Sequence, residues 1–218
     1  MEKRKLIIFG AGEAGREILN SIIKDFNRIN VQFQWDVIGF IESNPELLGK
    51  EVCEIKVFSL QQILDLKMND EIYAICPLLN TEIRRRVVND EILALNFKLA
   101  NIIHPSVVIS PTAILTNGLV LFPNVVIGDK AHIGQGAIIN YNSIIGHDVV
   151  ISSNCFLGPG VTLTGRCTLG ENVLMGAGSI CIPGVEIGAN SRIAAGIVVT
   201  TNVNANTTML LRQNIIKM

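Results

Sequence analysis

The sequence is poor in aromatic and charged residues, and each shortage excludes a class of protein. Only 5% of the 218 residues are aromatic and 17% are charged, and the formal net charge is −1. No basic run is longer than Arg84-Arg85-Arg86, so we expect no broad electropositive face and no nucleic-acid binding. No window approaches the roughly 18 uninterrupted apolar residues of a membrane-spanning helix, so we expect no membrane insertion.

Cysteine is also scarce, and its pattern is not that of a disulfide-rich or zinc-binding protein. The five cysteines are odd in number and include no CxxC pair, which predicts reduced thiols in a cytoplasmic protein. The start of the chain, Met1 to Leu6, leads into a short apolar strand without a small-residue cleavage site, and we expect no signal peptide. Aliphatic residues are plentiful instead, since 49% of the chain is apolar.

The first hundred residues alternate between short apolar runs and helical patterns, which predicts a small parallel sheet of Rossmann-like α/β type. Strands are expected over residues 5–9, 35–41, 71–76 and 97–102. Helices are expected after Gly12, after a capping-box pattern at Ser59 and Gln62, and over residues 81–95. The inward face of this last helix is expected to comprise Ile83, Val87, Val88, Ile92 and Leu93.

From Ile103 onward the pattern has a period of six residues. Every sixth position up to Val199 is apolar, and the next position is often glycine. This period fits one short strand and one turn, with three such units in each coil of a prism. A sandwich of short strands would not keep this register unbroken. We therefore predict a Rossmann-like domain over residues 1–102 and a parallel β-helix over residues 103–218.

Two repeats and one N-terminal unit carry a resemblance to a known family. Residues 127–132 (Ile-Gly-Asp-Lys-Ala-His) and 133–138 (Ile-Gly-Gln-Gly-Ala-Ile) resemble the repeats of hexapeptide-repeat acyltransferases, which fold as a left-handed parallel β-helix. The unit at residues 7–12 (Ile-Ile-Phe-Gly-Ala-Gly) narrows the resemblance to the sialic-acid O-acetyltransferase and UDP-4-amino-sugar N-acetyltransferase family, which includes the bacillosamine-pathway enzyme. The resemblance covers residues 5–205.

The resemblance implies an activity, a co-substrate and an assembly. The expected reaction is acetyl transfer from acetyl-CoA to a nucleotide-linked amino sugar or a related sugar hydroxyl, in surface polysaccharide or glycan biosynthesis. The expected assembly is a homotrimer with active sites between subunits, and no metal is expected. Alternatives that the sequence leaves open are a non-sugar acceptor such as an amino acid, a larger acyl group, and a catalytically inactive β-helix binding protein.

A glycine-rich loop between the first strand and the first helix fits the pattern G-x-G-x-x-G over residues 10–15. Such a loop lets backbone approach a diphosphate at a helix N-terminus. The domain has too few strands for a full dinucleotide fold, which argues against NAD, and the resemblance assigns the loop to the acceptor. At Gly12 we expect that only glycine leaves room for the ligand and for a positive φ. The expected acceptor-binding residues are Gly10, Gly12, Glu13, Ala14, Glu42, Ser43 and Cys76.

Two of these positions depart from the family pattern. The family usually has an acidic pair after the second strand, and here Glu42 is followed by Ser43. Glu42 could accept hydrogen bonds from a base or ribose, or be a solvated loop carboxylate. Cys76 follows the third strand, where the family often has glycine.

Acetyl transfer needs a base that takes a proton from the acceptor amine or hydroxyl. His147, followed by Asp148, resembles the catalytic pair of the family and should project from a turn, with Asp148 orienting the imidazole. His104 is interpreted as a structural or rim residue and His132 as a solvated one. The three histidines are 28 and 15 residues apart, which does not match an 18-residue coil, so a zinc site like that of γ-carbonic anhydrases is not expected.

For acetyl-CoA the resemblance implies backbone contacts at Gly165, Ala177 and Ala195. Phe156 stands nine residues after His147, where many family members have a second histidine that bonds the acetyl carbonyl. Phenylalanine cannot donate that bond, so either a backbone N–H or water polarises the thioester, or Phe156 forms an apolar wall for the acyl group. The tail over residues 208–214 lacks the Val-x-Gly-x-Pro-Ala segment of many relatives, so no adenine contacts are assigned there.

Overall fold

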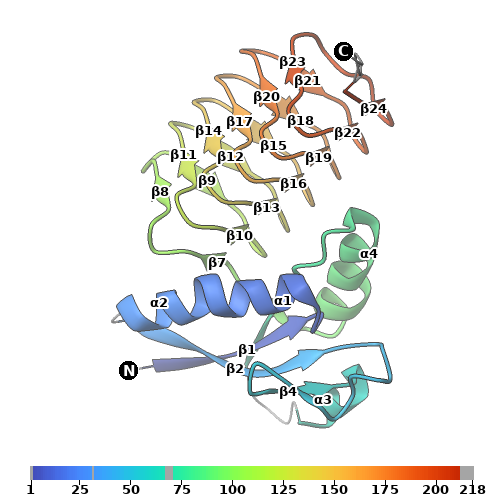
Figure 1. Cartoon of the computed structure of the whole chain (residues 1–218). Helices are drawn as coiled ribbons and strands as arrows, with labels where there is room; N and C mark the ends of the chain where they lie inside the picture. The colour runs from blue at the N-terminus through green and yellow to red at the C-terminus, as the bar shows by residue number, and fades with distance from the viewer. Residues whose placement is uncertain (1, 31, 67–70, 212–218) are drawn as a thin grey trace, which may run out of the picture.

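The computed structural model of the chain describes residues 2–30, 32–66 and 71–211. A small α/β unit at the N-terminus is followed by a left-handed parallel β-helix, and the long helix after β1 lies between the sheet and the prism (Figure 1). The predicted fold class is confirmed. Within the described ranges, no helix combines the length and the apolar character needed to cross a bilayer.

The N-terminal unit is a six-stranded sheet in the order β3-β4-β2-β1-β5-β6. All neighbouring pairs are parallel except β3 and β4, which form an antiparallel hairpin. The strands are β1 (Glu2–Phe9), β2 (Phe33–Ile41), β3 (Glu51–Val52), β4 (Ile55–Phe58), β5 (Ile72–Ile75) and β6 (Lys98–Leu99). The sequence reasoning missed the β3–β4 hairpin, whose turn residues Cys53 and Glu54 have positive φ values that neither residue type favours.

Helical segments cover both faces of this sheet. One helix runs through α1 (Glu13–Ile18), the π-helical η1 (Leu19–Ile23) and α2 (Lys24–Ile29), and another runs through α4 (Thr81–Arg86) and the π-helical η2 (Val87–Leu93). The third helix, α3 (Leu60–Leu66), begins at the predicted capping box. There the Ser59 N–H donates to Oε1 of Gln62 (2.8 Å) and the Gln62 N–H donates to Oγ of Ser59 (3.3 Å).

Three parallel sheets form the faces of the prism. The β7 face contains β7 (Ile102–Ile103), β10 (Val120–Leu121), β13 (Ile138–Ile139), β16 (Phe156–Leu157), β19 (Leu174–Met175), β22 (Arg192–Ile193) and β24 (Thr208–Met209). The β8 face contains β8 (Val108–Ile109), β11 (Val126–Ile127), β14 (Ile144–Ile145), β17 (Thr162–Leu163), β20 (Ile180–Cys181) and β23 (Val198–Val199). The β9 face contains β9 (Ile114–Leu115), β12 (His132–Ile133), β15 (Val150–Ile151), β18 (Thr168–Leu169) and β21 (Glu186–Ile187).

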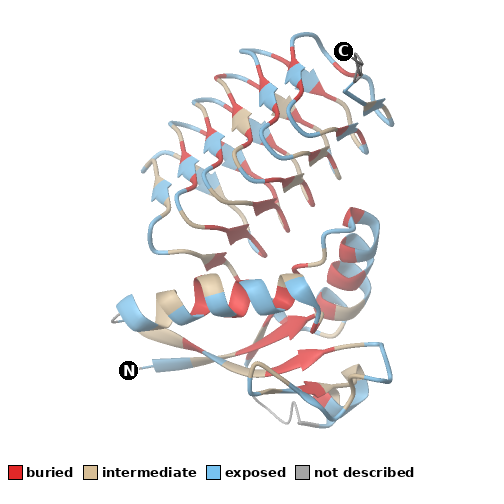
Figure 2. Cartoon of the chain, viewed as in Figure 1, coloured by how far each residue is buried: buried red, intermediate tan, exposed pale blue. Residues whose placement is uncertain are grey.

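The second residue of each of these short strands points into the prism, which confirms the six-residue register read from the sequence. From Leu121 to Val199 these inward residues are almost completely buried (Figure 2). The first coil is looser, because Ile103, Ile109 and Leu115 are only partly buried. The core of the β-helix is therefore a continuous column of aliphatic side chains.

Two details of the N-terminal unit differ from the sequence-based expectation. Ile83 and Leu93 were predicted to face inward, but they are 44% and 41% exposed. On α4, Arg84 is buried and its neighbour Ile83 is not. Further along the helix, the π-helical geometry of η2 shifts the helical phase at Leu93. The fourth predicted strand, residues 97–102, is divided between β6 in the N-terminal sheet and β7 in the β-helix.

The two parts of the chain share one apolar cluster. Ile18 and Ile22 of the long helix pack in the same buried cluster as Ile102, Val120 and Ile138, which point outward from the β7 face. The N-terminal unit therefore covers the first coils of that face. The other two faces carry no such cover from the described part of the chain.

Candidate active site

His147 and Asp148 form a hydrogen-bonded pair on the turn that follows β14. Nδ1 of His147 lies 2.8 Å from Oδ2 of Asp148, and both side chains are about half exposed (53% and 48%). Because a carboxylate only accepts hydrogen bonds, Nδ1 carries the proton and Nε2 retains a lone pair. This hydrogen bond is also the main cause that lowers the pKa of Asp148, with smaller contributions from Lys130 and Arg166. The arrangement is that of an accessible general base.

The neighbouring coil fixes where the imidazole lies. Gly165 occupies the same corner one coil further on, where the Arg166 N–H donates to the carbonyl of His147 (2.9 Å). A Cβ placed on Gly165 would lie 2.5 Å from Cε1 of the His147 ring, which is closer than van der Waals contact allows. The ring therefore rests on the bare Cα of Gly165. Of the predicted donor-site residues, this is the one that the structure places beside His147.

The other two histidines have different surroundings. His104 bridges the two parts of the chain, because its Nε2 lies 3.3 Å from Oδ2 of Asp25 and its Nδ1 lies 2.7 Å from Oγ of Ser106. These contacts agree with the structural role expected for it. His132 points outward from β12 and is exposed. Within the described ranges, no group of three or more His, Cys, Asp or Glu residues is arranged to hold a metal ion.

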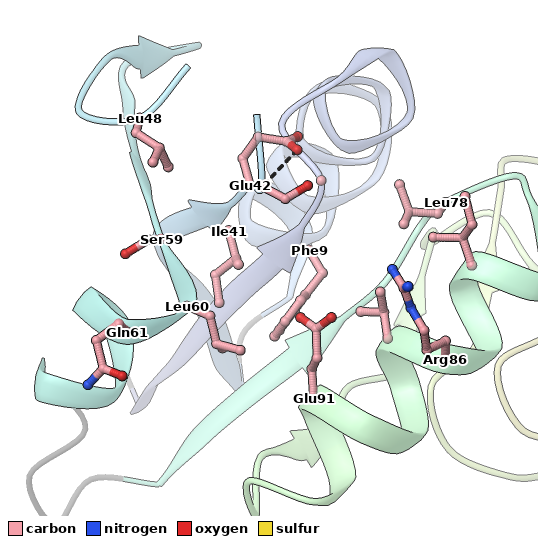
Figure 3. A pocket seen from close by; sticks show the side chains of 14 residues that line it. Phe9, Ile41, Glu42, Leu48, Ser59, Leu60, Gln61, Leu78, Arg86 and Glu91 are labelled. Carbon is pink, nitrogen blue, oxygen red and sulfur yellow. Dashed lines mark hydrogen bonds between the residues drawn. The ribbon is translucent and has the colours of Figure 1, made fainter. Parts of the chain in front are cut away.

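A cavity of about 420 Å³ lies at the carboxyl ends of β1 and β2, between α3 and α4 (Figure 3). It contains three of the predicted acceptor-binding residues, Gly10, Glu42 and Ser43. Its other lining residues include Phe9, Ile41, Leu48, Ser59, Leu60, Gln61, Leu78, Ile83, Arg86, Val87 and Glu91. The cavity thus combines apolar walls with a few polar groups, which is the usual composition of a small-molecule site. The sequence reasoning did not assign any residue of α3, α4 or η2 to the acceptor.

The remaining predicted acceptor residues lie outside this cavity. Glu13 and Ala14 line a smaller one of about 110 Å³, between α1 and the β7 face. Cys76 directly follows β5 in the sequence and is buried, and this burial raises the pKa of its thiol to about 11. Gly12 has φ −74°, so the expectation of a positive φ at this residue is wrong. A Cβ on Gly12 would meet no atom within 4 Å, so nothing in the free chain requires glycine there.

The predicted acetyl-CoA residues fall on more than one part of the prism. Ala177 and Ala195 are exposed on turns one coil apart, between the β7 and β8 faces. Phe156 is half-buried on the β7 face and is the cross-strand neighbour of Ile138, at the edge of the surface that the N-terminal unit covers. Within one chain these residues do not gather around His147. Residues 212–214 of the tail lie outside the described residues.

Arg84 is a residue whose position the sequence did not reveal. Its side chain is completely buried, and burial lowers its pKa to about 10. Nε donates to Oδ1 of Asn154 (2.7 Å), Nη1 donates to the carbonyl of Leu78 (2.7 Å), and Nη2 donates to the carbonyls of Asn154 (2.7 Å) and Cys155 (3.1 Å). Arg84 thus joins α4 and the loop after β5 to the β-helix.

Comparison with protein families identifies the repeats. A family model described as "Bacterial transferase hexapeptide (six repeats)" matches residues 148–182, and one described as "Hexapeptide repeat of succinyl-transferase" matches residues 166–201. No curated protein sequence matches the chain. The repeat class read from the sequence is confirmed.

Several solved structures are similar over nearly the whole chain. A variant of perosamine N-acetyltransferase from Caulobacter crescentus, in complex with CoA and GDP-perosamine, is 25% identical (TM-score 0.82), covering 94% of this chain and 92% of that chain. The acetyltransferase domain of PglB from Neisseria gonorrhoeae, in complex with acetyl coenzyme A, is 23% identical (TM-score 0.81; 94% and 95% covered). WeeI from Acinetobacter baumannii is 21% identical (TM-score 0.82; 94% and 95% covered). The last two show the shared fold, and the first confirms the predicted resemblance.

Proposed function

We propose that this chain, an acyltransferase with hexapeptide repeats, transfers the acetyl group of acetyl-CoA to the amino group of a nucleotide-linked sugar or to a related sugar hydroxyl. The observation that carries the proposal is the His147–Asp148 pair, with Nδ1 held by the carboxylate and the ring seated on Gly165. The similarity over 94% of the chain to an acetyltransferase in complex with CoA and GDP-perosamine supports this choice of donor and acceptor. The proposed role is in cytoplasmic biosynthesis of a surface polysaccharide or glycan.

The proposed reaction needs a base, and it needs a group that stabilises the positive charge that forms on that base. Nε2 of His147 takes a proton from the acceptor nitrogen or oxygen as that atom attacks the thioester carbonyl. Asp148 stabilises the imidazolium that forms. The tetrahedral intermediate then breaks its carbon–sulfur bond, and the proton held by His147 leaves with the CoA thiol. The products are an acetylated sugar and free CoA.

The acceptor is assigned to the 420 Å³ cavity of the N-terminal unit, at the end of the glycine-rich loop. Its lining residues come from the first 91 residues of the chain, and His147 is not among them. The acceptor must therefore reach a base that lies outside this cavity. A second copy of the chain can supply that base, and this requirement agrees with the expected homotrimer.

The β8 face is suited to contact such a second copy. Its outward residues Val108, Ile144 and Val198 are 61%, 48% and 53% exposed, and Val126 and Ile180 lie between them in the same cross-strand ladder. Thr162 is the one polar residue in this ladder, between Ile144 and Ile180. An exposed strip that is otherwise apolar marks a contact surface. The His147 turn directly follows β14 of this face, so a subunit covering the strip would lie beside the base.

We expect the purified protein to be a homotrimer whose assembly depends on this strip. Ile144→Asp places a carboxylate in the middle of the strip and should give monomers, because burying an unpaired charge costs several kcal/mol. Ile29→Asp is the matched control, since Ile29 is an apolar residue of α2 that is 56% exposed, and it should leave the trimer intact. Light scattering measures both masses. A wild-type monomer with full turnover would contradict both the trimer and the shared site.

The proposed reaction is tested by following CoA release with a panel of nucleotide-linked amino sugars. Turnover with at least one of them supports the proposal. Turnover only with amino acids, or only with a longer acyl-CoA, would instead favour the non-sugar acceptor or the larger acyl group. Tight binding of acetyl-CoA without turnover of any acceptor would indicate a β-helix binding protein.

We expect Gly12→Val to raise the KM for the acceptor strongly and to leave the affinity for acetyl-CoA nearly unchanged. A Cβ at this position meets no protein atom within 4 Å, so the free protein has room for the new side chain. A loss of acceptor affinity would then report contact with the ligand. Steady-state kinetics with both substrates separate the outcomes. Loss of CoA affinity would mean that the loop binds CoA, and unchanged kinetics would mean that it is only a turn.

A further inference from the structure

Three consecutive arginines of α4 have three different environments. Arg84 is buried against the β-helix. Arg85 is exposed on a polar cleft between α4 and the β-helix, which Glu171 and Asn172 also line. Arg86 is exposed and lines the acceptor cavity (Figure 3). Successive residues of a helix point about 100° apart, so one short basic run serves three surfaces.

The glycine-rich loop of the acceptor cavity already uses two of its N–H donors internally. The N–H of Gly10 donates to the carbonyl of Ile41 (2.8 Å). The N–H of Ala11 donates to Oε2 of Glu42 (3.1 Å). The other oxygen of Glu42, Oε1, accepts from the N–H groups of Ser43 (2.8 Å) and Asn44 (3.3 Å). A carboxylate therefore sits where this loop would otherwise present its Ala11 N–H to a ligand anion. Gly10 is the one residue of this loop among the described residues that line the cavity, and its N–H is also used, so a phosphate entering the cavity needs a donor from elsewhere.

Arg86 meets that need. It is the one basic side chain among the described residues that line the cavity, and its guanidinium is directed into the opening near Phe9 and Leu78 (Figure 3). No described residue accepts a hydrogen bond from this guanidinium. Burial raises the pKa of the Glu91 carboxyl, on η2. Arg86 lies close enough to oppose this shift, and its effect is the smaller of the two. The guanidinium is thus held at the cavity with its donors unused, in the planar form that binds phosphate oxygens in pairs.

We propose that Arg86, rather than the N–H groups of Gly10 and Ala11, binds the phosphate of the acceptor, and that the cavity therefore selects ligands that carry a nucleoside diphosphate. This inference rests on the proposed function, because it names the group that recognises the nucleotide portion of that acceptor. The apolar side chains of Phe9, Ile41 and Leu60 surround the rest of the cavity, where the uncharged part of the ligand has room. Arg86 is in this view a specificity-determining residue.

The test compares two neighbouring arginines by isothermal titration calorimetry of the full chain. UDP, GDP, dTDP and CDP are titrated into the wild-type protein, and the tightest binder is compared with its nucleoside. Arg86→Gln should weaken binding of that nucleoside diphosphate about 10- to 100-fold, the usual effect of losing hydrogen bonds to a charged group. Binding of the nucleoside should stay the same. Arg85→Gln removes the same charge one residue away, from the other cleft, and should change neither.

Three other results of the titrations would overturn the proposal, each for a different reason. If the wild-type protein binds none of the four nucleoside diphosphates, the nucleotide-linked acceptor of the proposed function is wrong, and the role of Arg86 is rejected with it. If the wild-type protein binds one of them and Arg86→Gln binds it equally well, Arg86 is not the phosphate ligand. If both variants lose affinity equally, the effect is one of overall charge. Both side chains are exposed, so neither substitution threatens the fold.

Discussion

Replacing His147 by Ala is expected to lower the turnover number of acetyl transfer by roughly 10²- to 10⁴-fold, the usual contribution of a general base. The reason is the geometry of the turn, where Asp148 holds Nδ1 and leaves Nε2 free to accept a proton. The side chain is 53% exposed and contributes nothing to the aliphatic column, so folding and assembly should survive. Steady-state assays and light scattering measure the two effects separately.

Two further variants divide the role of the base into its parts. Asp148→Asn keeps the shape of the partner but removes its charge, and it should cost less than His147→Ala because the imidazole itself remains. Gly165→Ala leaves both catalytic side chains in place and displaces the ring, since the new Cβ overlaps it. A turnover loss in Gly165→Ala would show that the position of the imidazole matters as well as its presence. Wild-type turnover in His147→Ala would remove His147 from the mechanism.

The largest expected effect on stability comes from Arg84. Replacing it by Met removes four hydrogen bonds at once. The carbonyl of Leu78 and both the carbonyl and Oδ1 of Asn154 lose this donor, whereas the carbonyl of Cys155 still accepts from the Ile138 N–H. Each buried acceptor left unsatisfied costs about 1–3 kcal/mol, partly offset because no charge is then buried. We expect a net loss of about 3 kcal/mol, or roughly 6–12 °C in melting temperature for a chain of this size.

The matched control is Arg85→Met on the same helix, which removes an exposed guanidinium and should change the unfolding free energy by no more than about 0.5 kcal/mol. Circular dichroism during heating measures both variants. Because α4 also forms one wall of the acceptor cavity, Arg84→Met should raise the acceptor KM as well, whereas Arg84→Lys should recover part of both effects. A melting temperature equal to that of the wild type would show that Arg84 does not hold the two parts of the chain together.

The sequence determined the β-helix because the signals for that fold are local. Each coil needs an aliphatic residue at every sixth position and a turn residue that tolerates a positive φ, such as Asn142 or Gly160, and each coil packs mainly on the next. The contact between His147 and Asp148 was predictable for the same reason, since the residues are adjacent. The strands and helices of the N-terminal unit likewise follow short-range periodicity, and the Ser59–Gln62 capping box is a four-residue signal.

Only the tertiary structure decided which residues meet across long separations. Arg84 bonds to a turn 70 residues away, and nothing in its own segment distinguishes it from Arg85 and Arg86. The bond from Ala11 to Glu42 spans 31 residues and changes what the glycine-rich loop can bind. The direction of each arginine depends on how a helix with a π-helical continuation packs against the β-helix. Such packing is a property of two surfaces together, and a pattern within one segment does not contain it.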